Sequence, residues 1–166
     1  GRDKMIVADG GQVTVESGGK VSVGSGGSIE LTSEAGLLSS IVRTLRARVT
    51  TAEVNAGKTL LAALTGYKYR LVDCLAIAIG GNAETVTTVD ILGTQSAAGA
   101  KLVAFAQASL QENVVLRAGG TGAAVLDGGA SFVACDAGAA ITIGKTGSNL
   151  ATATHIDVVL SYVIEA

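Results

Sequence analysis

The stretch Val13-Thr-Val-Glu-Ser-Gly-Gly-Lys20, Val21-Ser-Val-Gly-Ser-Gly-Gly-Ser28, Ile29-Glu-Leu-Thr-Ser-Glu-Ala-Gly36 repeats in units of eight residues. The first and third positions of every octad are aliphatic, and the second position is polar. Each octad closes on a glycine-containing run that also carries serine. The pattern predicts a short strand with one apolar face, followed by a turn in which glycine adopts positive φ without a steric clash.

Each octad strand offers only two apolar side chains for burial. Burying one of them contributes about 1.5–3 kcal/mol, whereas ordering the backbone of one residue costs about 1–2 kcal/mol. An octad therefore cannot stabilise itself, and stacked copies from several chains are needed. We expect residues 11–36 to form a short intertwined β-prism or β-helix stalk, most simply in a homotrimer. The alternative is a three-stranded antiparallel meander on the body of the same chain. The residues expected at the trimer interface are Val13, Val15, Val21, Val23, Ile29 and Leu31.

The composition is typical of one ordinary domain with an appendage. The 166 residues are 48% hydrophobic, with 23 Gly, no Pro and 3% aromatic residues, which predicts short strands and little helix. The net charge of −2 excludes a strongly basic nucleic-acid binder. Apolar runs such as residues 60–64 are far shorter than the ~20 residues of a membrane helix. We therefore expect neither a nucleic-acid nor a membrane partner.

Two short segments flank the octads. Residues 1–10 begin polar and then carry Met5, Ile6 and Val7, so they predict an N-terminal arm, either a frayed terminus or a strand that adds to a neighbouring sheet. Residues 37–44 have apolar side chains at helical spacing, which fits a linker or a short helix.

Residues 45–166 predict an antiparallel β-sandwich that resembles a jelly roll. From residue 43 onward Leu45, Ala47 and Val49 alternate with polar residues, so the first strand has one apolar face. The further predicted strands are 58–64, 67–79, 85–92, 101–107, 113–117, 124–126, 131–135, 140–143 and 154–165. A series of short strands without intervening helices favours a sandwich, and the lack of Trp favours a jelly roll over an immunoglobulin-like domain. The fold class is thus all-β.

No constellation of catalytic residues is evident, so we expect neither enzymatic activity nor a cofactor or metal site. The single histidine, His155, shares a strand face with Asp157, which allows the two to pair. Gly144-Lys145-Thr146 lacks the spacing of a phosphate-binding loop and predicts a hairpin turn. Cys74 and Cys135 lie in apolar runs and predict buried free thiols, with a disulfide as the alternative.

The only basic cluster of the sequence is Arg43, Arg46 and Arg48. Such a cluster is a solvated strand face in the simplest interpretation. The functional interpretation is a surface that pairs with acidic groups of a partner.

Two further stretches carry a resemblance, Tyr67-Lys-Tyr-Arg-Leu-Val-Asp-Cys-Leu-Ala-Ile-Ala-Ile-Gly-Gly-Asn82 and Ala134-Cys-Asp-Ala-Gly-Ala-Ala-Ile-Thr-Ile-Gly-Lys-Thr-Gly147. Together with the octads, they resemble small head decoration (cement) proteins of tailed bacteriophages. The resemblance implies a homotrimeric structural protein, assembled in the host cytoplasm, on the outer surface of the phage head in the virion. It also implies binding to the lattice of the major capsid protein, where a trimer at three-fold points bridges neighbouring subunits and stabilises the shell.

The expected capsid-contact residues lie in the arm and in the basic cluster. They are Met5, Ile6, Val7, Arg43, Arg46 and Arg48. The alternative function is a trimeric fibre tip or adhesin that binds a host-surface glycan. Sugar sites usually contain exposed aromatic side chains, of which this sequence has few.

Overall fold

The computed structural model describes residues 41–124 and 129–166. The octads with their predicted interface residues, the arm residues Met5, Ile6 and Val7, and most of the predicted linker lie outside these residues. The elements in chain order are β1 (Arg43–Thr50), α2 (Thr51–Ala56), β2 (Lys58–Leu61), β3 (Lys68–Ile79), β4 (Ala83–Gln95), β5 (Ala98–Ala106), β6 (Val115–Arg117), β7 (Ala123–Ala124), the 3-10 helix η1 (Ala130–Phe132), β8 (Ile141–Thr152) and β9 (His155–Glu165).

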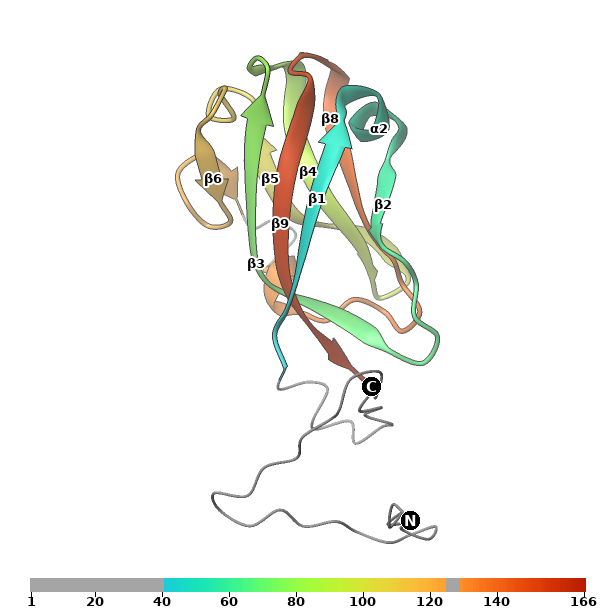
Figure 1. Cartoon of the computed structure of the whole chain (residues 1–166). Helices are drawn as coiled ribbons and strands as arrows, with labels where there is room; N and C mark the ends of the chain where they lie inside the picture. The colour runs from blue at the N-terminus through green and yellow to red at the C-terminus, as the bar shows by residue number, and fades with distance from the viewer. Residues whose placement is uncertain (1–40, 125–128) are drawn as a thin grey trace, which may run out of the picture. The chain divides into compact units, whose positions relative to one another are not determined.

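The strands form two antiparallel sheets. One has four strands in the order β1-β9-β3-β6, and the other has five in the order β2-β8-β4-β5-β7. The sheets lie face to face (Figure 1) and share one hydrophobic core. Leu160 of β9 and Ile91 of β4 are both completely buried in it. The predicted β-sandwich is therefore confirmed for this part of the chain.

Strand β9 lies between β1 and β3. Its ladder with β1 is regular over eight residue pairs, with Leu45 opposite Leu160 and Ala47 opposite Val158. Because side chains alternate along a strand, these residues face the core while the residues between them face outward. β1 begins at Arg43, two residues before the start predicted for the sandwich.

A six-residue helix, α2, follows β1 directly and was not predicted. Its first turn is closed by a capping box, in which the Glu53 amide donates to the Thr50 hydroxyl (3.3 Å) and the Thr50 amide donates to the Glu53 carboxylate (2.8 Å). Lys58 adds an ion pair to the same carboxylate, with Nζ 2.8 Å from Oε1. The helix thus covers the end of β1 and turns the chain towards β2.

The hairpin turn predicted at Gly144–Lys145–Thr146 is wrong, because β8 runs straight through these residues. The ladder between β4 and β8 changes register on either side of Val86. Opposite it, Gly147 has φ of 86° and an added Cβ would lie 2.8 Å from the Thr87 amide nitrogen. The glycine therefore provides the positive φ of a bulge within a long strand, and the chain does not reverse here.

The strand predicted over residues 131–135 is also wrong. This segment forms η1 and an irregular stretch, in which two backbone carbonyls accept hydrogen bonds from a side chain. Gln95 Nε2 donates to the carbonyls of Ala130 (2.7 Å) and Val133 (2.9 Å), and the Ser131 hydroxyl donates to the Leu102 carbonyl. These bonds anchor the segment beside the five-stranded sheet without adding a strand to it.

The β3–β9 register shifts between Leu71 and Asp73, which marks a bulge in β3. The prediction of buried free thiols is confirmed. Cys74 and Cys135 are free thiols, each 1% exposed. Burial raises the pKa of both thiols, so neither is poised as a nucleophile.

Candidate interaction surface

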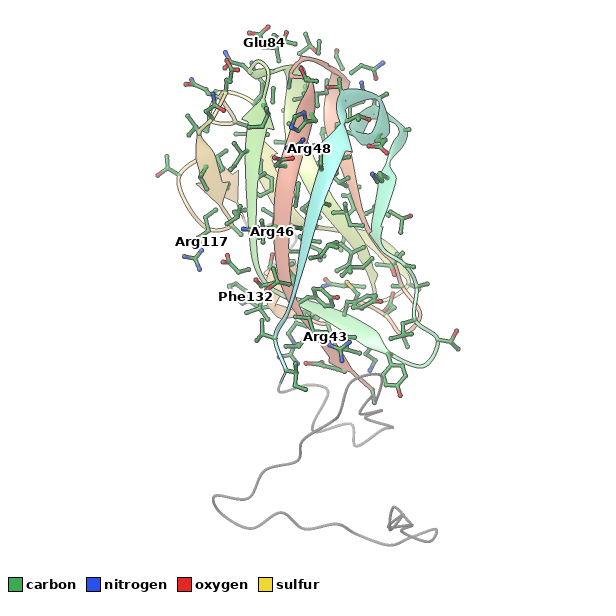
Figure 2. The ribbon with its side chains drawn as sticks, viewed as in Figure 1. Arg43, Arg46, Arg48, Glu84, Arg117 and Phe132 are labelled. Atoms are coloured by element: carbon green, nitrogen blue, oxygen red, sulfur yellow. The ribbon has the colours of Figure 1, made fainter. Side chains whose placement is uncertain are left out.

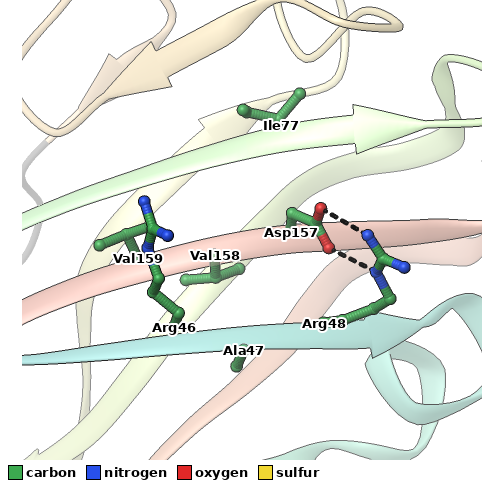
Figure 3. A pocket seen from close by; sticks show the side chains of 7 residues that line it. All are labelled: Arg46, Ala47, Arg48, Ile77, Asp157, Val158 and Val159. Atoms are coloured by element: carbon green, nitrogen blue, oxygen red, sulfur yellow. Dashed lines mark hydrogen bonds and ion pairs between the residues drawn. The ribbon is translucent and has the colours of Figure 1, made fainter.

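The outer face of the four-stranded sheet presents two of the three predicted arginines. The regular β1–β9 ladder places Arg46 opposite Val159 and Arg48 opposite Asp157. Both guanidinium groups extend from β1 over β9 (Figure 3). Arg43 lies three residues before Arg46 on β1, so its side chain is on the opposite face of the strand. There it interacts electrostatically with the buried Tyr69. The structure thus separates Arg43 from the other two.

Strands β3 and β6 complete this face. Ile77 of β3 lies opposite Asp157 on one side and Val115 on the other, and Leu75 lies opposite Arg117. Figure 2 shows Arg46 and Arg48 along β1 and Arg117 towards the opposite edge of the sheet. We call this surface the arginine face and define it by Arg46, Arg48, Ile77, Val115, Arg117 and Val159.

Aliphatic side chains occupy the two central strands of the arginine face, at Ile77 of β3 and Val159 of β9, and extend to Val115 on the edge strand β6. Val115 is 57% exposed, and Ile77 and Val159 are partly exposed. A shallow depression of about 510 Å³ runs between β1 and β3, lined by Arg46, Ala47, Arg48, Ile77, Asp157, Val158 and Val159 (Figure 3). The surface therefore offers apolar contact area with cations at both edges.

Two of the three arginines have carboxylate partners on the same face. Arg48 donates from Nε to Asp157 Oδ1 (3.0 Å) and from Nη2 to Oδ2 (3.2 Å). Arg117 holds Asp73 in the same way, at 3.0 Å from Nε and 2.8 Å from Nη2. The hydrogen bond from Arg48 is the main reason why the pKa of Asp157 lies below its ordinary value.

Arg46 differs from its two neighbours. Within residues 41–124 and 129–166, no carboxylate forms an ion pair with it. Its guanidinium group lies beside Val159, in the shallow depression. A cation next to an aliphatic side chain is suited to a partner that presents a carboxylate beside an apolar group.

The predicted proximity of His155 and Asp157 is confirmed, with His155 Nε2 3.5 Å from Asp157 Oδ1. The same carboxylate is bound by both donors of Arg48. His155 therefore adjoins an ion pair that is already formed, and the pair holds Asp157 in place on the outer face.

A second surface was missed in the sequence. Phe132 is 75% exposed, and Val72 and Val133 are both more than half exposed. A groove of about 130 Å³ runs beside Phe132 and includes Val72 and Asp73. We call Val72, Phe132 and Val133 the Phe132 patch. The β3 bulge leaves Val72 exposed, and the charged Asp73 within an otherwise apolar run is the one feature of the sequence that marks this position.

In the part of the chain that the structure describes, no group of three or more His, Cys, Asp or Glu side chains is placed to hold a metal ion. No helix among the described residues has the length and apolar character required to cross a bilayer.

Comparisons with known proteins gave no match. No family model matches the chain, and no curated protein and no solved structure is significantly similar to it.

Proposed function

We propose that the protein is a homotrimeric decoration protein that binds the outside of a phage capsid and stabilises the shell by bridging neighbouring major capsid subunits. The observation that supports this most is the arginine face, where aliphatic side chains and guanidinium groups share one uninterrupted sheet surface. Protein interfaces are enriched in arginine and in apolar contact area at their centre. Such a surface fits the docking of a protein rather than the enclosure of a small substrate.

The strand order supports a jelly roll within this proposal. Strands β1, β3, β6 and β9 form one sheet, while β2, β4, β5 and β8 lie in the other. Successive strands therefore cross repeatedly between the sheets, as the two Greek keys of a double-sheet jelly roll require. A sandwich of this kind holds the side chains of the arginine face in fixed positions on paired strands, which suits contact with a lattice.

The trimer part of the proposal rests on the octads of the sequence. Their aliphatic positions need neighbouring copies for burial, and three copies repeat one set of contacts at a three-fold point. Three weak contacts on one shell then act together, because the second and third bindings are intramolecular. The protein would accordingly reside on the outer surface of the phage head.

The test uses purified full-length protein and expanded capsids that lack it. The proposal predicts a trimeric mass by light scattering, saturable cosedimentation with the capsids, and a higher temperature of capsid disruption. A monomer that neither sediments with capsids nor shifts their disruption temperature would overturn it.

A second candidate is a fibre tip or adhesin that binds a glycan. The Phe132 patch favours it, because an exposed aromatic ring beside a groove is a platform on which a sugar ring stacks. Copy number separates the two functions, since a decoration protein is present in hundreds of copies per particle and a fibre tip in a few. Glycan-array binding that is lost in Phe132→Ala would favour the adhesin.

A further inference from the structure

The open edge of β1 differs from the rest of its sheet. Among the described residues, β1 is the terminal strand, paired only with β9. Alternate residues of an edge strand direct their N–H and C=O groups away from the sheet, which makes the edge a template for another strand. Edge strands are normally protected by proline, bulges, charged side chains or short length. β1 has no proline and no bulge, since its eight residues pair with β9 without a register shift, and its charged residues are all arginines, which repel a second copy of β1 but attract an acidic strand.

Burial along the inner face shows that β1 is incompletely covered. Leu160 and Val158 of β9 are 0% and 1% exposed. Their cross-strand partners on β1, Leu45 and Ala47, are only partly buried, although they face the same core. Val49, near α2, is fully buried. The incompletely buried inward-facing side chains therefore lie in the first part of β1, before Val49.

On the outer face of the same segment, the two arginines differ in their ion pairs. Arg48 has Asp157, whereas no carboxylate in the described parts of the chain pairs with Arg46. A strand added beside β1 would place its inward side chains against Leu45 and Ala47 and an outward side chain next to Arg46, because side chains alternate. The added strand therefore needs aliphatic residues inward and an acidic residue outward.

We propose that the edge of β1 binds an extended segment of a partner protein in which aliphatic and acidic residues alternate, by strand addition to the four-stranded sheet. Main-chain hydrogen bonds would supply general affinity, while the Arg46–carboxylate pair and the contacts with Leu45 and Ala47 select the sequence. This inference rests on the proposed function, since it specifies the kind of capsid segment that the arginine face would engage.

The experiment uses the full-length chain and a blocked nine-residue peptide of alternating Ile and Glu, with an Ile/Lys peptide as the control. Amide hydrogen exchange, read residue by residue, should slow at least tenfold at alternate β1 positions when the Ile/Glu peptide saturates the protein. Arg46→Gln should weaken peptide binding about tenfold. The control variant Lys145→Gln, which removes one positive charge from β8 of the other sheet and thus outside the arginine face, should leave binding within about twofold.

Equal weakening by both variants, or peptide binding without slower exchange in β1, would overturn strand addition. Protection of these β1 amides before any peptide is added would overturn it too, because the edge would then already be filled by the chain itself or by a second copy. Capsid cosedimentation of the same variants separates the two claims. If Arg46→Gln no longer binds the peptide but still binds capsids, strand addition is rejected as the mode of capsid attachment and the decoration role stands. If the original protein binds the peptide but not capsids, the decoration role is rejected and strand addition stands.

Discussion

Arg48 of β1 and Asp157 of β9 form a two-pronged ion pair across the first ladder of the four-stranded sheet, with Nε–Oδ1 at 3.0 Å and Nη2–Oδ2 at 3.2 Å. The Arg48 side chain is 68% exposed and that of Asp157 is 35% exposed, so water screens most of the attraction. A double-mutant cycle with Arg48→Ala and Asp157→Ala should therefore show only weak coupling in urea unfolding, with the effects of the two single changes nearly additive. Strong non-additivity would show that the pair is far more important for folding than its exposure indicates.

The turn between β4 and β5 provides a second prediction. Ser96 and Ala97 both have positive φ, at 53° and 59°, and both amides donate to the Asp136 carboxylate at 2.9 Å. Asp136→Ala should lower the free energy of unfolding by about 2 kcal/mol, since two hydrogen bonds to a charged acceptor are lost. Replacing Ser96–Ala97 by Asn–Gly should raise it by about 1 kcal/mol, because these residues tolerate positive φ. Destabilisation by the Asn–Gly replacement would exclude this interpretation of the turn.

The period-two pattern explains why the sequence predicted β1 and β9 well. Leu45, Ala47 and Val49 alternate with polar residues, and this fixes both the strand and its buried face. The same alternation identified Arg46 and Arg48 as outward-facing. The lack of a carboxylate partner for Arg46 could not be predicted, because it depends on which strands become neighbours.

The wrong predictions have a common physical cause. Each rested on a short local pattern, whereas contacts between residues far apart in the sequence determine the structure at these positions. Thr50 and Glu53 have the spacing of a capping box, but the helix was not predicted because six residues are too few to show helical periodicity. The glycines around Lys145 suggested a turn, whereas the ladder with β4 uses Gly147 for a bulge. The strand predicted over residues 131–135 gives way to side-chain hydrogen bonds from Gln95.

The capping box predicts a specific pH dependence. Hydrogen bonds from Lys58 and from the Thr50 amide lower the pKa of Glu53 from its ordinary 4.5 to about 2. The folded state therefore binds this proton more weakly than the unfolded state, so the stabilisation is present above pH 4.5 and is lost as the pH falls towards 2. Glu53→Gln should lower Tm at pH 6, and the difference from the original protein should disappear near pH 2. Glu112→Gln controls for net charge, and an equal Tm loss in this control would reject the role of the capping box.

Gly147 and Gly57 provide a matched pair for the bulge. Both have positive φ, at 86° and 82°, so alanine is strained at either position. An added Cβ meets nothing within 4 Å at Gly57 but lies 2.8 Å from the Thr87 amide nitrogen at Gly147. Gly57→Ala should cost about 1 kcal/mol in unfolding free energy, and Gly147→Ala at least about 2 kcal/mol more, because backbone must move. Equal costs in thermal or urea unfolding would show that the bulge accommodates a side chain.

Cosedimentation with expanded, undecorated capsids is the most direct test of the decoration role, with the number of bound chains counted at saturation. We expect three chains at each occupied three-fold position, and a strong loss of binding in Arg46→Glu while the variant keeps its fold. Absence of saturable binding by the original protein, or equal binding by Arg46→Glu, would show that the arginine face does not attach this protein to a capsid.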